Sequence, residues 1–124
     1  MNQLCDLSGE GLRRLLALGQ VTSREILESC IDRIEALNPA LNAFVATRFE
    51  EARAEADAVD ARVRTGAGRG GLAGLPVAVK DLNDVAGLPT TFGSPLYRDN
   101  MAARDDDVVA AMRAADGILL GKTN

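Results

Sequence analysis

Leu75-Pro76-Val77-Ala78-Val79 is a compact apolar run with two β-branched residues, and it predicts a buried strand with a proline near its start. A second apolar run, Ile118-Leu119-Leu120, predicts another strand. Between them, apolar positions within residues 108–112 follow the aspartates at 105–107, which predicts a helix with an acidic first turn. A strand, a crossover that contains a helix and a second strand imply a parallel pair inside an α/β sheet.

Two amphipathic helices open the chain. Leucines at helical spacing lie between Ser8, a good N-cap, and Gly19, a good C-terminal stop. The sequence Thr22-Ser23-Arg24-Glu25 then forms a capping box, because the threonine oxygen and the glutamate three residues later can bond each other's backbone N–H groups. We expect this second helix to end at Asn38-Pro39.

The segment up to the first strand contains one more helix and a flexible link. Apolar residues recur every three or four positions from 48 to 64, with the acidic residues, Asp60 among them, on other faces. Residues 42–46 fit either a short buried strand or an extended connection. The glycine-rich run at 66–71 predicts a flexible boundary. The predicted organisation is a helical arm at 1–65, a glycine-rich link at 66–73 and the start of an α/β core at 74–124.

The predicted sheet is incomplete. Two parallel strands do not form a stable sheet with both faces covered. The chain reaches Asn124 directly after the second strand, with no helix after it to cover that strand. We therefore expect the 124 residues to be the N-terminal part of a single larger domain.

The composition excludes several classes of partner. With a net charge of −4 and a pI near 4.8, the chain offers no electrostatic footprint for nucleic acid or an anionic membrane. It has no run of 18 apolar residues and no basic segment followed by an apolar one at its N-terminus. Cys5 and Cys30 form no recognisable ligand set, so we interpret both as ordinary thiols in a cytoplasmic protein.

The types of basic residue in this chain are unusual. Histidine is absent, which excludes a Ser-His-Asp or Cys-His nucleophile system and imidazole metal ligation within this chain. Proton transfer near neutral pH then falls to carboxylates, to Tyr97 or to a lysine. Of the 14 basic residues only Lys80 and Lys122 are lysines, and the others are arginines.

Two motifs resemble phosphate-binding loops but lack the required context. The glycine-rich run at 66–71 precedes a strand, whereas a phosphate-cradling loop follows one and opens a helix. Gly121-Lys122-Thr123 matches the end of a Walker A loop. Asp116, however, occupies the place of its first glycine, and residues 118–120 favour a strand. Neither motif therefore predicts a nucleotide site.

The acidic residues do not predict a metal centre. Asp81 with Asp84, or the run at 105–107, could supply carboxylate ligands. Neither set has a histidine partner or the glycine-turned loop of a calcium site, and capping, turn formation and solvated charge explain them better. We expect neither a metal nor a cofactor.

Lys80 is the strongest candidate for a catalytic group. It comes directly after a predicted parallel strand, where open α/β sheets place their ligand crevices. A lysine in water has a pKa of about 10.4 and is a poor base, but desolvation can lower that value by about 3–5 units. The alternative is a lysine that extends to solvent or pairs with Asp81 or a more distant acid.

Three blocks of sequence resemble the N-terminal part of the amidase signature family. They are residues 74–81 (GLPVAVKD), 84–94 (DVAGLPTTFGS) and 120–124 (LGKTN). Residues 21–25, 33–39 and 42–44 look like that family's N-terminal helices. The resemblance covers essentially the whole chain, and the block around Lys80 is its specific part.

The resemblance implies an amidase signature fold, in which a helical arm leads into the first strands of a mixed, largely parallel sheet. It also implies amide hydrolysis through a Ser-cis-Ser-Lys triad, with Lys80 as the lysine that deprotonates the bridging serine. In the family both serines follow the Gly-Lys-Thr-Asn motif, at which this chain stops, and none of its own serines matches them. Asp116-Gly117 departs from the usual Gly-Ala, and Leu82-Asn83 from the usual order after Lys-Asp.

The sequence thus predicts the N-terminal segment of an amide hydrolase, inactive by itself, whose complete form acts on a small-molecule amide. One alternative is a segment like that of a glutamyl- or aspartyl-tRNA amidotransferase, in its amide-cleaving A component. Another is a non-catalytic remnant or partner-binding module. The substrate and the oligomeric state, including a homodimer, are left open.

Overall fold

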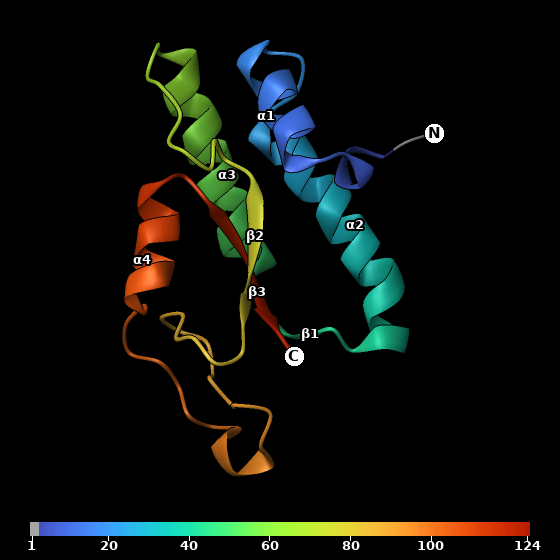
Figure 1. Cartoon of the computed structure of the whole chain (residues 1–124), viewed down its shortest axis with the longest axis vertical. Helices are drawn as coiled ribbons and strands as arrows, with labels where there is room; N and C mark the ends of the chain where they lie inside the picture. The colour runs from blue at the N-terminus through green and yellow to red at the C-terminus, as the bar shows by residue number, and fades with distance from the viewer. Residues whose placement is uncertain (1–2) are drawn as a thin grey trace.

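A computed structural model describes residues 3–124 and shows helices grouped around a small sheet (Figure 1). The elements in chain order are η1 (Leu4–Asp6), α1 (Gly9–Ala17), α2 (Ser23–Leu41), β1 (Phe44–Thr47), α3 (Phe49–Arg64), β2 (Pro76–Lys80), η2 (Pro95–Tyr97), α4 (Asp107–Ala114) and β3 (Ile118–Thr123). None of the helices within residues 3–124 is both long enough and apolar enough to cross a membrane.

The caps predicted for the first two helices form. The Ser8 hydroxyl accepts a hydrogen bond from the Gly11 N–H at 3.1 Å, and Gly19 follows α1 with a φ of +66°. At the start of α2, the Glu25 N–H donates to the Thr22 hydroxyl at 3.1 Å and the Thr22 N–H donates to the Glu25 carboxylate at 2.8 Å. These bonds satisfy N–H groups that have no partner within the helix.

The second helix passes the predicted stop at Asn38-Pro39 and ends at Leu41, so that prediction was wrong. Pro39 lies in the last turn, where its missing N–H removes one helical bond and leaves the turn intact. The Asn42 N–H closes that turn on the Asn38 carbonyl at 2.7 Å. The Asn38 side chain then accepts from the Phe44 N–H and donates to the Phe44 carbonyl, which directs the chain into β1.

The sheet has the strand order β1-β3-β2. Strand β2 pairs with β3 in parallel, as predicted, and β1 pairs with β3 antiparallel. Residues 42–46, for which a strand and an extended connection were both open, thus contribute to an edge strand. Strand β3 continues beyond the predicted residues 118–120 to Thr123, and this extension carries Lys122 into the sheet.

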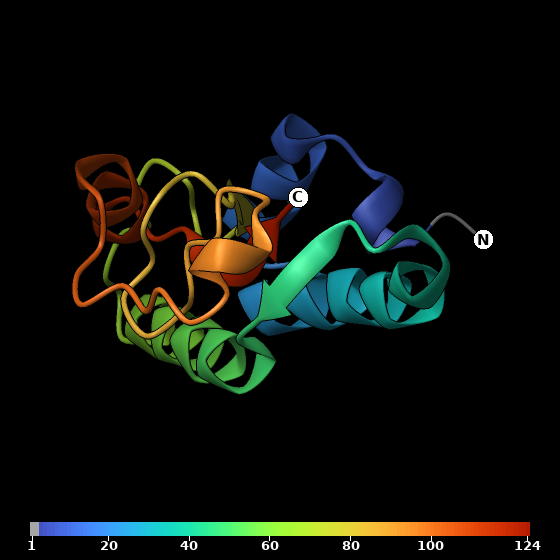
Figure 2. The same cartoon turned by 90° about the horizontal axis from the view of Figure 1, so that it is seen from below.

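Both faces of β3 are covered by apolar side chains. Ile118 and Leu120 pack with residues of α2 and α3, which lie side by side, whereas Leu119 packs with Val79 and with Val109 of α4 (Figures 1 and 2). This alternation follows from the two-residue period of a strand. A third cluster joins α1, the start of α2 and the turn before β2, and its buried members are Leu12, Leu16, Ile26 and Ala73.

The glycine-rich link is tied to the turn between α4 and β3. The Gly70 N–H donates to the Asp116 carboxylate at 2.6 Å, and Arg62 donates to its other oxygen at 2.5 Å. Asp116 has a φ of +63°, in the left-handed region that glycine adopts without strain. The glycine-rich run was predicted to be flexible, but near its end, at Gly70, it is held to Asp116.

Both cysteines are free thiols, as predicted. Burial raises the pKa of Cys30 to about 11, and the nearby Cys5 adds to this effect. Because the thiolate is the reactive form, Cys30 is a weak nucleophile at neutral pH.

Candidate functional site

Lys80 is the last residue of β2 and lies beside Thr123 of the parallel strand β3. The carboxyl ends of β2 and β3 therefore meet at one end of the sheet, as the sequence predicted. Lys80 is exposed, as is Ala78 two positions before it, whereas Val79 between them is buried, so Lys80 lies on the face of β2 that residues 3–124 leave uncovered. The desolvation expected for this amine is thus not supplied by residues 3–124.

Lys122, on the neighbouring strand, has the opposite environment. Its side chain is 0% exposed, and its Nζ lies 3.2 Å from an Asp81 oxygen. The same Nζ donates to the Pro89 carbonyl and to the Thr90 hydroxyl, each at 3.1 Å. An ammonium group has three N–H donors, so these three acceptors saturate it. The amine is enclosed by protein groups and is not placed to hold a nucleotide phosphate.

Asp81 is the acceptor at the centre of this cluster. It is 3% exposed, and besides Lys122 it accepts hydrogen bonds from the backbone N–H of Thr91 at 3.0 Å and from the Thr91 hydroxyl. Burial acts to raise the pKa of Asp81, but the bonds from Thr91 and the charge of Lys122 outweigh it and hold the pKa below the ordinary value. Asp81 is therefore an anion held in place, and its partner is Lys122 rather than the adjacent Lys80.

Thr90 links this cluster to a second carboxylate. Its hydroxyl donates to Asp84 at 2.6 Å while it accepts from Lys122. Thr90 is 0% exposed, so both bonds are made away from solvent. Each buried polar group of the cluster thereby has a partner, which is what makes its burial tolerable.

A shallow hollow opens beside the cluster. Its volume is about 280 Å³. The loop after β2 and the ends of the strands both contribute to its walls. Its lining residues are Asn42, Val45, Asp81, Thr91, Gly93, Ser94, Pro95, Arg98 and Asn124.

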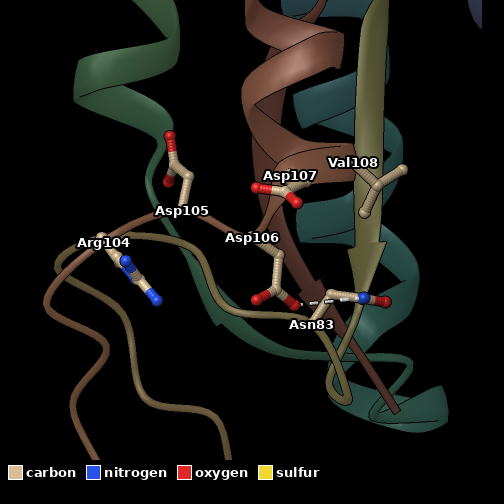
Figure 3. Close-up of a pocket in the computed structure, with 6 residues that line it drawn as sticks. All are labelled: Asn83, Arg104, Asp105, Asp106, Asp107 and Val108. Carbon is tan, nitrogen blue, oxygen red and sulfur yellow. Dashed lines mark hydrogen bonds between the residues drawn. The ribbon is translucent and has the colours of Figure 1, made fainter.

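A larger acidic hollow lies at the start of α4 (Figure 3). Its lining comprises Asn83, Arg104 and residues Asp105–Val108, and its volume is about 470 Å³. The Asp106 carboxylate accepts from the Asp84 N–H at 2.9 Å and from the Asn83 amide, and Asp105 accepts from the Ala86 N–H at 2.8 Å. These bonds fasten the turn after β2 to the start of α4, which supports a structural interpretation of these aspartates. Within residues 3–124, no three acidic or cysteine side chains gather to hold a metal.

The serine hydroxyls hold local structure. Ser8 caps α1, Ser23 accepts from Arg69 at 2.8 Å, Ser29 accepts from the Cys5 N–H at 3.1 Å, and Ser94 accepts from the Leu96 N–H at 3.3 Å. Each hydroxyl thus accepts a hydrogen bond from another group of the chain. None is hydrogen-bonded to Lys80 within the described part of the chain.

The sequence predicted a role for Lys80 but none for Lys122, Thr90 or Thr91. A usable signal was present, because Lys122 follows an apolar strand and Asp81 follows the parallel strand beside it. Parallel strands bring such residues together at the same end of a sheet. The two threonines lie in a loop without regular secondary structure, and no pattern in the sequence places them against Asp81.

The fold is that of a known family. Residues 25–124 match the model of the amidase family, and the chain belongs to that family, the amidase signature enzymes. It is 40% identical over 124 residues to the A component of the glutamyl-tRNA(Gln) amidotransferase from Salinispora arenicola, covering 100% of this chain and 25% of that protein. It is 38% identical over 118 residues to an acylamidase from Rhodococcus erythropolis, covering 95% and 25%.

A solved structure shows the same fold. The chain superposes on a bacterial aryl acylamidase of the amidase signature family with a TM-score of 0.87 and 36% identity. The match covers 95% of this chain and 25% of that one. The chain thus spans about a quarter of the length of the relatives that it matches, and the predicted fold class is confirmed for this part of the domain.

Proposed function

We propose that this chain is the lysine-bearing N-terminal segment of an amide-hydrolysing enzyme, in which Lys80 is the general base. The observation that carries the proposal is the position of Lys80, which ends a parallel strand and presents an exposed amine while the adjacent carboxylate is bound to Lys122. Membership of the amidase family and similarity to an acylamidase support the same reaction class.

The proposed chemistry divides between this segment and the remainder of an amidase domain. The Lys80 amine takes the proton of a bridging serine hydroxyl, and that serine activates the nucleophilic serine for attack on the amide carbonyl. The leaving amine departs with a proton, and water then hydrolyses the acyl-enzyme. Both serines are assigned to a part of the amidase domain outside these 124 residues, because none of the serine hydroxyls within residues 3–124 is hydrogen-bonded to Lys80.

A lysine acts as a base only when its environment disfavours the ammonium form. The exposed amine at the edge strand lacks such an environment within residues 3–124. In the proposed enzyme the rest of the domain covers this edge and desolvates the amine. We therefore expect the 124-residue chain alone to be inactive.

The test compares variants of a polypeptide that joins this chain to the serine-bearing block. Lys80→Ala should lower turnover of an aryl amide about 10³-fold or more, because it removes the base. Lys80→Arg is the matched control, since it keeps the positive charge but not the ability to lose a proton at neutral pH. Equal activity of the Lys80→Arg variant and the parent, or turnover by the 124-residue chain alone, would overturn the proposal.

The glutaminase component of a tRNA amidotransferase is a second candidate. It is favoured by the 40% identity to the A component of a glutamyl-tRNA(Gln) amidotransferase, which is as high as the identity to the acylamidase. The same assay distinguishes the two, because a glutaminase releases ammonia from glutamine and depends on a partner protein, whereas an acylamidase cleaves an aryl amide unaided. A third candidate, a non-catalytic partner-binding module, requires the joined polypeptide to be inactive toward both substrates.

A further inference from the structure

We propose that Lys122 is a positioning residue for Lys80: by binding Asp81 on one side of the sheet, it keeps the Lys80 amine free of a carboxylate partner on the other. The proposal rests on the proposed role of Lys80 as the base. It concerns a residue to which the sequence assigned no role, although Lys122 lies in a rejected nucleotide-binding motif and in one block of the family resemblance.

The geometry of the strand separates the two side chains. Lys80 is the last residue of β2 and Asp81 begins the turn after it, and the alternation of the strand, in which Val79 is buried and Lys80 exposed, continues with the buried Asp81. Lys80 is exposed, whereas Asp81 is buried against Lys122 and Thr91. An adjacent Lys-Asp pair in a flexible segment could instead form an ion pair with itself.

The backbone fixes this arrangement from both sides. The Asp81 N–H donates to the Thr123 carbonyl at 2.8 Å, and the Phe92 N–H donates to the Asp81 carbonyl at 3.1 Å. Together with the bonds to its carboxylate, these contacts leave Asp81 little freedom to turn toward Lys80. The positive charge of Lys122 balances the Asp81 carboxylate within the core. The other two N–H donors of Lys122 bond Pro89 and Thr90, which holds the amine in this position.

Lys80, by contrast, forms no ion pair with any of residues 3–124. A carboxylate next to an ammonium group stabilises the charged form and makes the amine a poorer proton acceptor. Binding of Asp81 by Lys122 removes the nearest source of that effect. In a chain whose other basic residues are all arginines, a lysine fits this enclosed site because three donors on one nitrogen match three converging acceptors.

The experiment measures the reactivity of Lys80 in the 124-residue chain. Limiting acetic anhydride at about pH 8 acetylates free amines, and peptide mass spectrometry gives the rate at Lys80 relative to added N-acetyl-lysine amide. Lys122→Met should lower this relative rate about threefold, because it leaves one uncompensated negative charge several ångström from the amine. The double variant Asp81→Asn, Lys122→Met should restore it.

Two further variants keep the result interpretable. Thr91→Val removes one donor to Asp81 and retains Lys122, so it should lower the rate by a smaller factor even if Lys122→Met fails to fold. Asp60→Asn breaks a buried contact elsewhere and should lower stability without changing the rate. An unchanged rate in every folded variant among Lys122→Met and Thr91→Val overturns the proposal. Because no turnover is measured, the role of Lys80 as a base can fail independently.

Discussion

The carboxylate of Asp60 in α3 accepts hydrogen bonds from the first two backbone N–H groups of α2, those of Ser23 at 2.9 Å and Arg24 at 3.0 Å. Thr22 and Glu25 satisfy the neighbouring donors through their capping box. The first turn of α2 is therefore bonded by a side chain from another helix as well as by its own. This contact joins the two helices that cover one face of β3.

Asp60→Asn should destabilise the chain by about 1–2 kcal/mol, because one backbone donor of α2 loses a charged acceptor in a buried site. Urea unfolding followed by circular dichroism measures the change. Asp57→Asn is the matched control on the same helix, since Asp57 is exposed and pairs with Arg24 at the surface, and it should cost less than about 0.5 kcal/mol. Similar losses of unfolding free energy in both variants would contradict the role of Asp60 as the acceptor for the first turn of α2.

The two lysines should differ sharply in their contribution to folding. Lys122→Met leaves the buried Asp81 carboxylate without its counter-charge and should cost about 3–5 kcal/mol. Lys80→Met alters an exposed side chain and should change stability by about 0.5 kcal/mol or less. The free energies of unfolding of the two variants provide the measurement, and a larger loss for Lys80→Met would be inconsistent with the structure.

Asp116 should contribute to acid sensitivity. Burial acts to raise its pKa, but the Gly70 N–H and the Arg62 guanidinium outweigh it and hold the pKa below its ordinary value. The folded state then binds this proton more weakly than the unfolded state, so the stabilisation is complete above about pH 3.9 and is lost as the pH falls through the lower folded value.

The Asp116→Asn variant tests this dependence. It should be less stable than the parent at about pH 7 by about 1 kcal/mol, and the difference should shrink below about pH 4. Urea unfolding between about pH 7 and about pH 2.5 follows the two curves. A difference that stays constant with pH would mean that the charge of Asp116 is unimportant.

Gly121 should be intolerant of a side chain. It has a φ of +155°, and a Cβ atom there would overlap the backbone carbonyl of Ala46 on β1. Gly121→Ala should therefore destabilise the chain by about 1–3 kcal/mol and weaken the pairing of β1 with β3. Faster amide hydrogen exchange in β1 would report the second effect.

Gly68→Ala is the control for this substitution. A Cβ at Gly68 meets nothing within 4 Å, so the change should lie within about 0.5 kcal/mol of zero or be slightly stabilising through the unfolded state. Equal stability of the two glycine variants would contradict the close approach of β1 to β3 at Gly121.

The departure at Asp116 now has a physical account. The amidase resemblance implies glycine where this chain has aspartate, and glycine reaches a positive φ without strain. Aspartate is less favourable than glycine at a φ of +63°, but its carboxylate accepts hydrogen bonds from Gly70 and Arg62. No comparable account emerges for Leu82, which is exposed.

Local patterns predicted much of the fold. The caps at Ser8 and Thr22, the parallel strands and the helix between them follow from periodicity and from hydrogen-bond groups a few residues apart. Asp60 was predicted on a polar face, yet it lies four residues after the buried Ala56 and so belongs to the same helix face. Spacing could have shown this, but an aspartate is rarely buried without a partner that sequence does not reveal.

The sequence by itself determined the family, the strand that leads into Lys80 and the absence of a histidine base in this chain, because each depends on residue identity and short spacing. Only the tertiary structure decided which lysine is exposed and which is enclosed. Lys80 and Lys122 both lie at the ends of parallel strands, but their surroundings differ. Lys80 lies on the exposed face of β2, whereas Lys122 is enclosed by acceptors from the turn and loop that follow β2. The pairing of Asp81 with Lys122 joins residues 41 positions apart, and a contact of that separation is set by the packing of the sheet rather than by any local preference.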